Sequence, residues 1–429
     1  MRELHLFIIA GENSGDIHGS NMLRAMRALY PRIRAVGLGG PKLEEAGMKL
    51  RTNMVKNLAI IGIVGVLRNF FTIRRIFLDT EEYLRNHRPD AIILIDYAGF
   101  NIRMAERAKR LGIPVIWYIS PQIWAWHKER IHTLARVVDL MIVIFPFEVS
   151  LYRKKDVDVV HVGHPLFDLI RIDQTKEEVY AEFGLDTKRP LITLVPGSRK
   201  REVTDFLSIM LQGARRYWEK HPSTQFAVIK ASSIDDDMIY KIIDKEELPF
   251  DVKVIGRDRQ RFNLRQFADF SWVKSGTSTL EAALLGAPHL IVYKVNFLTW
   301  VIAKQLFTIS YIGLPNIVAG STIVPELLQD EFTPLNLADQ TAFYMDRKEE
   351  YQRMVNDLRK VKEKLGGPGA SKRAARAILD MLGIKYQDSE SEEDATAPAE
   401  TGPPSRAEES DAFPLPASTT GKYPWNNTP

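Results

Sequence analysis

Short, continuous apolar runs separated by amphipathic segments recur along most of this sequence and constrain its fold more than any other feature. Runs rich in β-branched residues are typical of parallel strands, because the connecting helices bury the sheet on both faces. The runs are Leu4–Ala10, Ile33–Leu38, Ala91–Ile95, Val115–Ile119, Leu140–Ile144, Leu191–Val195, Phe226–Ile229, Val252–Ile255 and His289–Tyr293. The pattern predicts an α/β fold built on parallel sheets.

The runs form two series that meet near His164 and Pro165, which predicts two doubly wound domains. The length of 429 residues also exceeds what a single core usually holds. If the domains face each other, the carboxyl ends of their strands point toward a common cleft. The predicted boundaries are 1–164 and 165–365 for the two domains, 366–386 for a C-terminal helix, and 387–429 for a disordered tail.

The tail is acidic and the rest of the chain is basic. Residues 386–429 contain nine acidic and two basic residues, and the whole chain has a net charge of +4, so residues 1–385 carry +11. Basic surface suits nucleotides, nucleic acid or anionic lipid head groups. We expect no nucleic-acid partner, because the sequence lacks the aromatic and basic signatures of RNA-binding domains.

The sequence contains no cysteine, which excludes disulfides, thiolate nucleophiles and cysteine-based zinc sites. Nothing at the N-terminus resembles a signal peptide, so we expect a cytoplasmic protein. No apolar run is long enough to cross a bilayer. His161 and His164 do not have a metal-ligand spacing, and we expect neither a metal nor a cofactor.

One apolar stretch, Leu58–Leu67, precedes aromatic and basic residues in a pattern that suits shallow insertion into a membrane interface. The membrane-facing side chains are predicted to be Ile61, Ile63, Val66, Leu67, Phe70 and Phe71. Residues 297–314 form a similar, longer stretch. Burial in a core is the alternative for both, because apolar stripes usually face cores.

Small and hydroxyl residues occupy a predicted helix start at Ser275, Gly276, Thr277 and Ser278. The unpaired N–H groups and the positive dipole end of a helix make such a start a seat for phosphate. Glu281 lies about one turn further on, where its carboxylate is expected to accept hydrogen bonds from a ribose. The alternative is an ordinary helix with a Ser or Thr cap and Glu281 completing a capping box.

Asp96 directly follows the run Ala91–Ile95, so its carboxylate is expected at the carboxyl edge of the first sheet. A general base would occupy such a position. Partial burial would raise the pKa of this carboxyl toward the range that a base needs, whereas nearby basic residues would lower it. The alternative is that Asp96 caps the following helix.

Other loops after predicted strands carry weaker signals. Gly11 and Gly15 have a spacing that fits neither the dinucleotide fingerprint nor the Walker A pattern, and Asp16 is expected to cap the next helix. Trp124 and Trp126 are expected to be exposed and to line a site for a sugar face or an acyl chain, unless they pack under a loop.

Polar residues also follow strands in the second series. Arg199, after Ser198 in a glycine-containing turn, has the planar guanidinium that suits a pyrophosphate. Asn316, Glu326 and Gln329 add polar groups to an apolar region, and turns or caps are the alternative for them.

Taken in order, these motifs resemble those of the lipid-A-disaccharide synthase family. The matching segments are Gly11–Asp16, Asp96–Asn101, Ser120–Trp126, Pro196–Arg199, Ser275–Thr277 and Leu314–Asn316, within a resemblance that spans residues 4–385. It implies two facing doubly wound Rossmann-like domains of the GT-B type. It also implies an inverting glycosyltransferase that joins UDP-2,3-diacylglucosamine to 2,3-diacylglucosamine 1-phosphate (lipid X), forms the β-1,6 disaccharide of lipid A biosynthesis, and releases UDP without a metal.

On this resemblance Asp96 is the expected base for one in-line displacement. The UDP-sugar is expected at Ser198, Arg199, Ser275, Gly276, Thr277, Ser278, Glu281, Asn316, Glu326 and Gln329. The acceptor or the acyl chains are expected at Ser14, Gly15, Asp16, Trp124 and Trp126. Acylated substrates favour the interfacial interpretation of Leu58–Phe71, so we expect peripheral attachment to anionic lipid on the inner face of the cytoplasmic membrane. A homodimer is left open.

Two rival functions also remain open from the sequence. A UDP-sugar epimerase of the same architecture would share the phosphate and ribose sites but would need no lipid-facing segment. A non-catalytic RNA- or lipid-binding protein would use the basic body of the chain.

Overall fold

The computed structural model describes residues 2–55, 70–125, 128–256, 258–296 and 310–386. These residues form two compact units: one runs up to Asp168 and includes the segment that begins at Leu365, and the other runs from Leu169 to Lys364. Each unit is built on one parallel sheet, which confirms the fold class predicted from the apolar runs. The predicted disordered tail, residues 387–429, lies outside the described residues.

The first unit contains a seven-stranded sheet with the order β3-β2-β1-β4-β5-β6-β7. Its strands are β1 (Leu4–Ala10), β2 (Ile33–Gly39), β3 (Lys49–Asn53), β4 (Ala91–Ile95), β5 (Val115–Tyr118), β6 (Leu140–Val143) and β7 (Val159–His161). The helices are α1 (Asn13–Leu29), α2 (Pro41–Glu45), α5 (Phe70–His87), α6 (Ala98–Arg110), α7 (Ile131–Val137), α8 (Pro146–Arg153) and α19 (Ala370–Met381), and the short α9 (Leu166–Leu169) spans the boundary between the units. The strand order changes direction between β1 and β4, and ligands of open α/β sheets bind beyond the strand ends at such a switch point.

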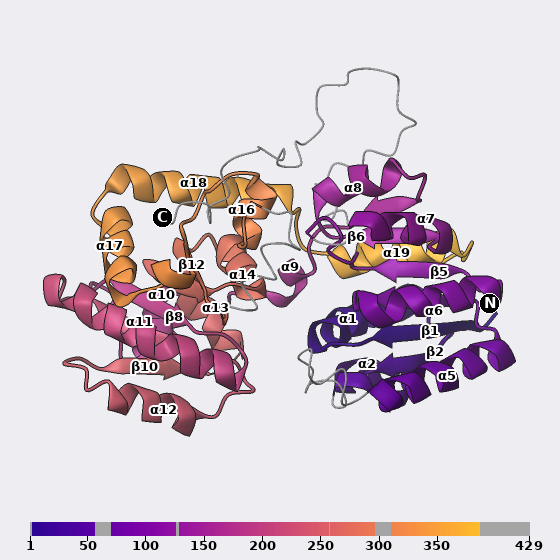
Figure 1. Cartoon of the computed structure of the whole chain (residues 1–429), viewed down its shortest axis with the longest axis horizontal. Helices are drawn as coiled ribbons and strands as arrows, with labels where there is room; N and C mark the ends of the chain where they lie inside the picture. The colour runs from indigo at the N-terminus through magenta and orange to yellow at the C-terminus, as the bar shows by residue number, and fades with distance from the viewer. Residues whose placement is uncertain (1, 56–69, 126–127, 257, 297–309, 387–429) are drawn as a thin grey trace, which may run out of the picture. The chain divides into compact units, whose positions relative to one another are not determined.

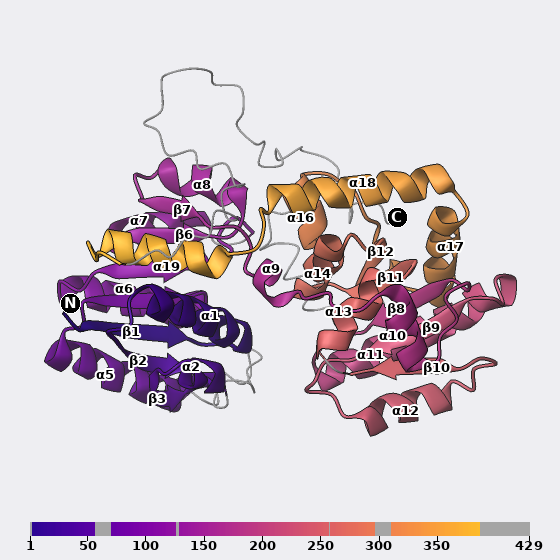
Figure 2. The same ribbon diagram turned by 180° about the vertical axis from the view of Figure 1, so that it is seen from behind.

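Alternate side chains of each central strand face opposite sides of this sheet. Phe7 and Ile9 pack with buried residues of α5 and α6 such as Leu84 and Met104. The C-terminal helix α19 belongs to the same unit, where it packs along α1 (Figures 1 and 2). The carboxylate of Asp168 holds the start of α19 by accepting two of its backbone N–H groups, at 2.6 and 2.9 Å.

The second unit contains a six-stranded sheet with the order β10-β9-β8-β11-β12-β13. Its strands are β8 (Leu191–Val195), β9 (Gln225–Ile229), β10 (Val252–Ile255), β11 (Phe270–Lys274), β12 (His289–Tyr293) and β13 (Glu326–Leu328). The helices are α10 (Lys176–Phe183), α11 (Lys200–Lys220), α12 (Asp236–Lys245), α13 (Asp258–Gln266), α14 (Thr277–Leu285), α16 (Leu314–Ala319), α17 (Pro334–Met345) and α18 (Lys348–Lys364). The switch point of this sheet lies between β8 and β11, so the loops that follow these two strands meet there.

Four strands lie outside the predicted apolar runs: β3, β7, β11 and β13. Of these, β3, β7 and β13 lie at sheet edges and have partly exposed residues, so their sequences lack a continuous apolar run. The central strand β11 is mostly buried, but Ser271 and Lys274 interrupt its apolar residues. The first helix begins at Asn13, earlier than the predicted start near Asp16. Among the helices of the described ranges, none combines the length and the apolar character needed to span a bilayer.

Candidate functional site

The loop between β11 and α14 carries the predicted phosphate seat. Gly276 is the N-cap residue of α14 with a φ of 148°, and no side chain in the described part of the chain caps this helix. The Ser275 N–H donates to Val292 O at 2.9 Å, which ties the loop to β12. Thr277, in the first turn, is exposed. This helix start fits an anion, and it does not match the alternative of a helix capped by Ser or Thr.

Glu281 is buried in α14, where it forms two ion pairs rather than a capping box. Its Oε2 lies 2.7 Å from Arg265 Nη1, and its Oε1 lies 3.4 Å from Arg261 Nη2. The fully buried Arg265 also donates to Ser278 O at 2.7 Å, so it links the carboxylate to the first turn of the helix. Burial lowers the pKa of Arg265, and Glu281 opposes that change. The two ion pairs hold the Glu281 carboxylate in place. The pair at Oε1 is the longer and therefore the weaker of the two.

Glu202, in the first turn of α11, brings together Arg199 and Lys274, the last residue of β11. Its Oε1 lies 3.0 Å from both Arg199 Nη1 and Lys274 Nζ, while its Oε2 accepts the N–H groups of Ser198 and Arg199. Burial alone would raise the pKa of Glu202, but the charge and hydrogen bond of Lys274 and the charge of Arg199 lower it. Glu202 and Lys274 were not among the predicted site residues, because no local pattern pairs residues that lie 72 positions apart.

Asn316, Glu326 and Gln329 anchor the loops beside β12 and β13. Asn316 is fully buried, its Oδ1 accepts two backbone N–H groups at 2.9 and 3.1 Å, and its Nδ2 donates to Glu326 Oε1 at 2.8 Å. Glu326 also accepts two backbone N–H groups, at 2.9 and 3.0 Å. Gln329 Oε1 accepts the Val295 N–H at 2.9 Å. These bonds favour the alternative in which the three side chains shape turns.

Asp96 follows β4 at the switch point of the first sheet. Asp96 and Tyr97 both adopt left-handed backbone, with φ values of 44° and 49°. Two successive non-glycine residues in this region are strained, and such strain tends to occur at functional sites. The turn is held by Asn101, whose Nδ2 donates to Asp96 O at 2.8 Å. Tyr97 is the N-cap residue of α6, and no described side chain caps that helix, so the alternative role of Asp96 as a cap is not supported.

The surroundings of the Asp96 carboxyl raise its pKa to about 6. Burial is the main cause, the Glu12 carboxylate adds to it, and a hydrogen bond from the Tyr97 N–H acts in the opposite direction. Gly11 permits this arrangement, because a Cβ at that position would overlap the Tyr97 ring. A carboxyl with this pKa is ionised at neutral pH and remains basic enough to accept a proton.

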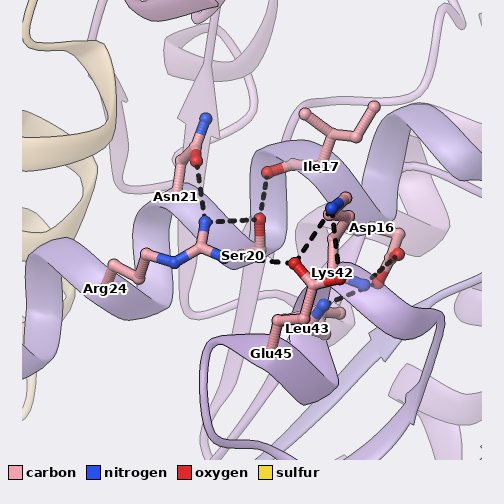
Figure 3. Close-up of polar contacts among 8 residues, drawn as sticks. All are labelled: Asp16, Ile17, Ser20, Asn21, Arg24, Lys42, Leu43 and Glu45. Atoms are coloured by element: carbon pink, nitrogen blue, oxygen red, sulfur yellow. Dashed lines mark hydrogen bonds and ion pairs between the residues drawn. The ribbon is translucent and has the colours of Figure 1, made fainter.

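Asp16 is buried and its carboxylate supports the fold. It accepts the backbone N–H groups of Gly40 at 2.8 Å, Lys42 at 2.9 Å and Leu43 at 3.0 Å, and the last two residues are drawn with it in Figure 3. These bonds cap α2, so the prediction that Asp16 caps the helix after β1 was wrong. The reason is that α1 begins at Asn13, three residues before Asp16, so the Asp16 side chain lies inside the helix and contacts the start of α2.

Trp124 is buried, which corrects the expectation of an exposed indole and favours packing under a loop. Its Nε1 donates to Glu148 Oε1 at 3.1 Å, and this oxygen also accepts Ser120 Oγ at 3.0 Å. The other oxygen of Glu148 accepts the Phe145 N–H at 3.1 Å. Burial raises the pKa of Glu148 to about 7, and these hydrogen bonds oppose the rise. Glu148 was not among the predicted site residues, and Trp126 lies outside the described residues.

The remaining predicted residues of the first unit differ in exposure. Ser14 is exposed and Gly15 is buried. Phe70 and Phe71, at the start of α5, are 51% and 82% exposed. The other predicted membrane-facing residues, Ile61, Ile63, Val66 and Leu67, lie outside the described residues.

Known proteins resemble this chain at two levels. A family model described as lipid-A-disaccharide synthetase matches residues 6–380. The lipid-A-disaccharide synthase of Trichlorobacter lovleyi is 41% identical over 382 residues, which cover 89% of this chain and 98% of that protein. That of Geobacter sulfurreducens is 40% identical over 378 residues, covering 88% and 97%. A solved UDP-GlcNAc 2-epimerase from Neisseria meningitidis, bound to UDP-GlcNAc, has a TM-score of 0.59 at 12% identity, covers 89% of this chain and 100% of that one, and shows the fold alone.

Proposed function

The chain belongs to the lipid-A-disaccharide synthase family, and from this premise we propose that it joins UDP-2,3-diacylglucosamine to 2,3-diacylglucosamine 1-phosphate and releases UDP. It is a glycosyltransferase with a GT-B-like fold of two parallel sheets. The family match over residues 6–380 is the observation that carries this proposal. The rival epimerase function has only a likeness in fold, which does not indicate an activity.

The donor binds to the second unit in this proposal. The helix start at Ser275–Ser278 receives the diphosphate, because its N–H groups and dipole favour an anion. Arg199 and Ser198 contribute from the other loop at the switch point, and the 81% exposed side chain of Arg199 can reach a ligand. Glu281 accepts a ribose hydroxyl through Oε1, the oxygen with the weaker ion pair.

Asp96 acts as the base that activates the acceptor. The acceptor hydroxyl gives its proton to the Asp96 carboxylate as its oxygen attacks the anomeric carbon of the donor. The bond from that carbon to the UDP oxygen breaks on the opposite side, so an α-linked donor yields a β-linked product. The pKa of about 6 supports this role, because the carboxylate is the main form at neutral pH.

Among the residues in the loops around the first switch point, some can contact the acceptor and others hold neighbouring loops in place. Ser14 is exposed at the start of α1 and is available to the acceptor. Asp16 and Trp124 are buried and hydrogen-bonded, so we assign them to the support of neighbouring loops.

The protein attaches peripherally to an anionic membrane through the start of α5. The exposed Phe70 and Phe71 suit an interface, and the exposed Arg74 and Arg75 lie one turn further along the helix. Basic residues near an anionic membrane surface each contribute about 1 kcal/mol to binding. Attachment of this kind would give the enzyme access to acylated substrates.

Mass spectrometry of the products tests the proposed reaction. The protein is mixed with UDP-2,3-diacylglucosamine and 2,3-diacylglucosamine 1-phosphate, and we expect a tetraacylated disaccharide 1-phosphate together with UDP. An isomerised UDP-sugar without a disaccharide would indicate an epimerase. Unchanged substrates from the folded protein would refute the proposal.

A further inference from the structure

Lys274 ends β11 immediately before the proposed phosphate seat, and its side chain is only 16% exposed. A buried ammonium loses most of its hydration and needs a compensating partner. Glu202 Oε1 supplies that partner at 3.0 Å, and the Tyr293 ring lies 5.8 Å from the same Nζ. The side chain is therefore held at the carboxyl edge of the second sheet, next to Ser275.

Lys274, Glu202 and Arg199 form a cluster in which the positive charges outnumber the negative ones. Glu202 Oε1 is shared between the Lys274 ammonium and the Arg199 guanidinium, each at 3.0 Å. The second Glu202 oxygen already accepts two backbone N–H groups at the start of α11. One carboxylate thus faces two cations, and the cluster keeps a net positive charge beside the start of α14. Positive charge held in this way suits an anionic ligand.

We propose that Lys274 binds the diphosphate of the donor as a second cation, with Glu202 as the positioning residue that holds Lys274 and Arg199 in place. The inference rests on the proposed donor seat at α14 and adds a residue that the family resemblance does not supply. When the bond between the anomeric carbon and the diphosphate oxygen breaks, its electron pair stays on the leaving UDP. A fixed ammonium next to that oxygen stabilises the developing charge without rearrangement.

Lys230 offers a matched control at the same edge of the same sheet. It follows β9, its side chain is 11% exposed, and its Nζ lies 3.0 Å from Asp236 Oδ1. Lys230→Met removes an ion pair with the more exposed Asp236 and a hydrogen bond from Lys230 Nζ to Ile234 O at 2.7 Å, at a strand that does not border the switch point. Both variants therefore replace a largely buried, ion-paired lysine, and only Lys274→Met removes the proposed ligand contact.

Calorimetric titration of the full chain with UDP and with uridine tests the inference. We expect Lys274→Met to weaken UDP binding about tenfold or more, since it removes a charge-assisted hydrogen bond, and to leave uridine binding unchanged because uridine lacks the diphosphate. Lys274→Gln, which can still hydrogen-bond Glu202, should weaken UDP binding in the same way. Lys230→Met should bind both ligands like the unmodified protein.

Three results would overturn this inference without affecting the proposed function. They are UDP binding that survives in folded Lys274→Met and Lys274→Gln, an equal loss of UDP and uridine binding, and unfolding of both Lys274 variants, which would assign the residue to the fold. If the unmodified protein binds no UDP, the donor seat itself is wrong, which separates failure of the proposed function from failure of this inference.

Discussion

Replacing Asp96 with Asn should remove activity while making the folded protein more stable. Asn keeps the size of the side chain, and it tolerates left-handed backbone better than most residues, so the strained turn at φ 44° should persist. It cannot take a proton from the acceptor. The substitution therefore removes the proposed base with little disturbance of the surrounding structure.

The expected loss of turnover is on the order of 10²–10⁴, the usual contribution of a general base. In the unmodified protein kcat/KM should rise with pH through about 6, because the Asp96 carboxyl must be ionised to act and its pKa is about 6. The low-pH limb with this pKa should disappear from the residual activity of Asp96→Asn. UDP affinity should stay the same, since the donor seat belongs to the other unit.

The gain in stability follows from the same pKa. Folding raises the pKa of the Asp96 carboxyl from 3.8 to about 6, so the ionised group lowers the free energy of unfolding by up to about 3 kcal/mol at pH 7. The cost is absent below pH 3.8, where both states are protonated, and it develops fully as the pH rises past about 6. Asn carries no charge, so Asp96→Asn should be about 1–3 kcal/mol more stable at pH 7 and no more stable at pH 4.

Three measurements on one variant check this reasoning: turnover with both lipid substrates, UDP affinity by calorimetry, and urea unfolding at pH 4 and pH 7. Near-normal turnover would remove Asp96 from the mechanism. A loss of stability at pH 7 would show that burial of the carboxylate is not costly, and the account of its pKa would then be wrong.

Three further substitutions test other parts of the account. Glu281→Ala should weaken UDP binding about tenfold with a smaller effect on acceptor affinity, and equal loss of both in titrations would refute its role at the ribose. Phe70→Ser combined with Phe71→Ser should reduce co-sedimentation with anionic liposomes, whereas Leu335→Ser, at a 52% exposed position of the second unit, should not; unchanged sedimentation would exclude this helix start as the attachment site. Glu148→Ala should lower the free energy of unfolding by about 2–4 kcal/mol because it leaves buried hydroxyl, indole and backbone donors unpaired, and an unchanged urea midpoint would contradict that.

The central strands and the switch-point residues were predictable because their signals are local. A buried parallel strand such as Ala91–Ile95 is a continuous apolar run, and the residue after it, Asp96, must then lie at the carboxyl edge. Ser275–Ser278 were predicted instead from their small and hydroxyl side chains at a helix start, and α14 begins there. Edge strands such as β3 were missed, since their exposed and partly exposed positions hold polar residues.

The supporting contacts could not be predicted because they join distant parts of the sequence. Glu202 meets Lys274 only because α11 and β11 meet at one sheet edge, and Glu148 reaches Trp124 across 24 positions. In its local sequence, neither Glu202 nor Glu148 differs from an ordinary glutamate of a helix. The exposure of a loop side chain could not be predicted either. Trp124 is an example, because an aromatic loop residue has the same local sequence pattern whether it lines a site or packs beneath a loop.

The most direct test of the central claim is the configuration of the glycosidic bond in the product. A single displacement, with Asp96 as the only protein base, inverts the α-linked donor, so the anomeric proton of the isolated disaccharide should show the large NMR coupling of a β linkage. An α-linked product would require a second displacement and a second protein group, and it would contradict the mechanism proposed for this chain.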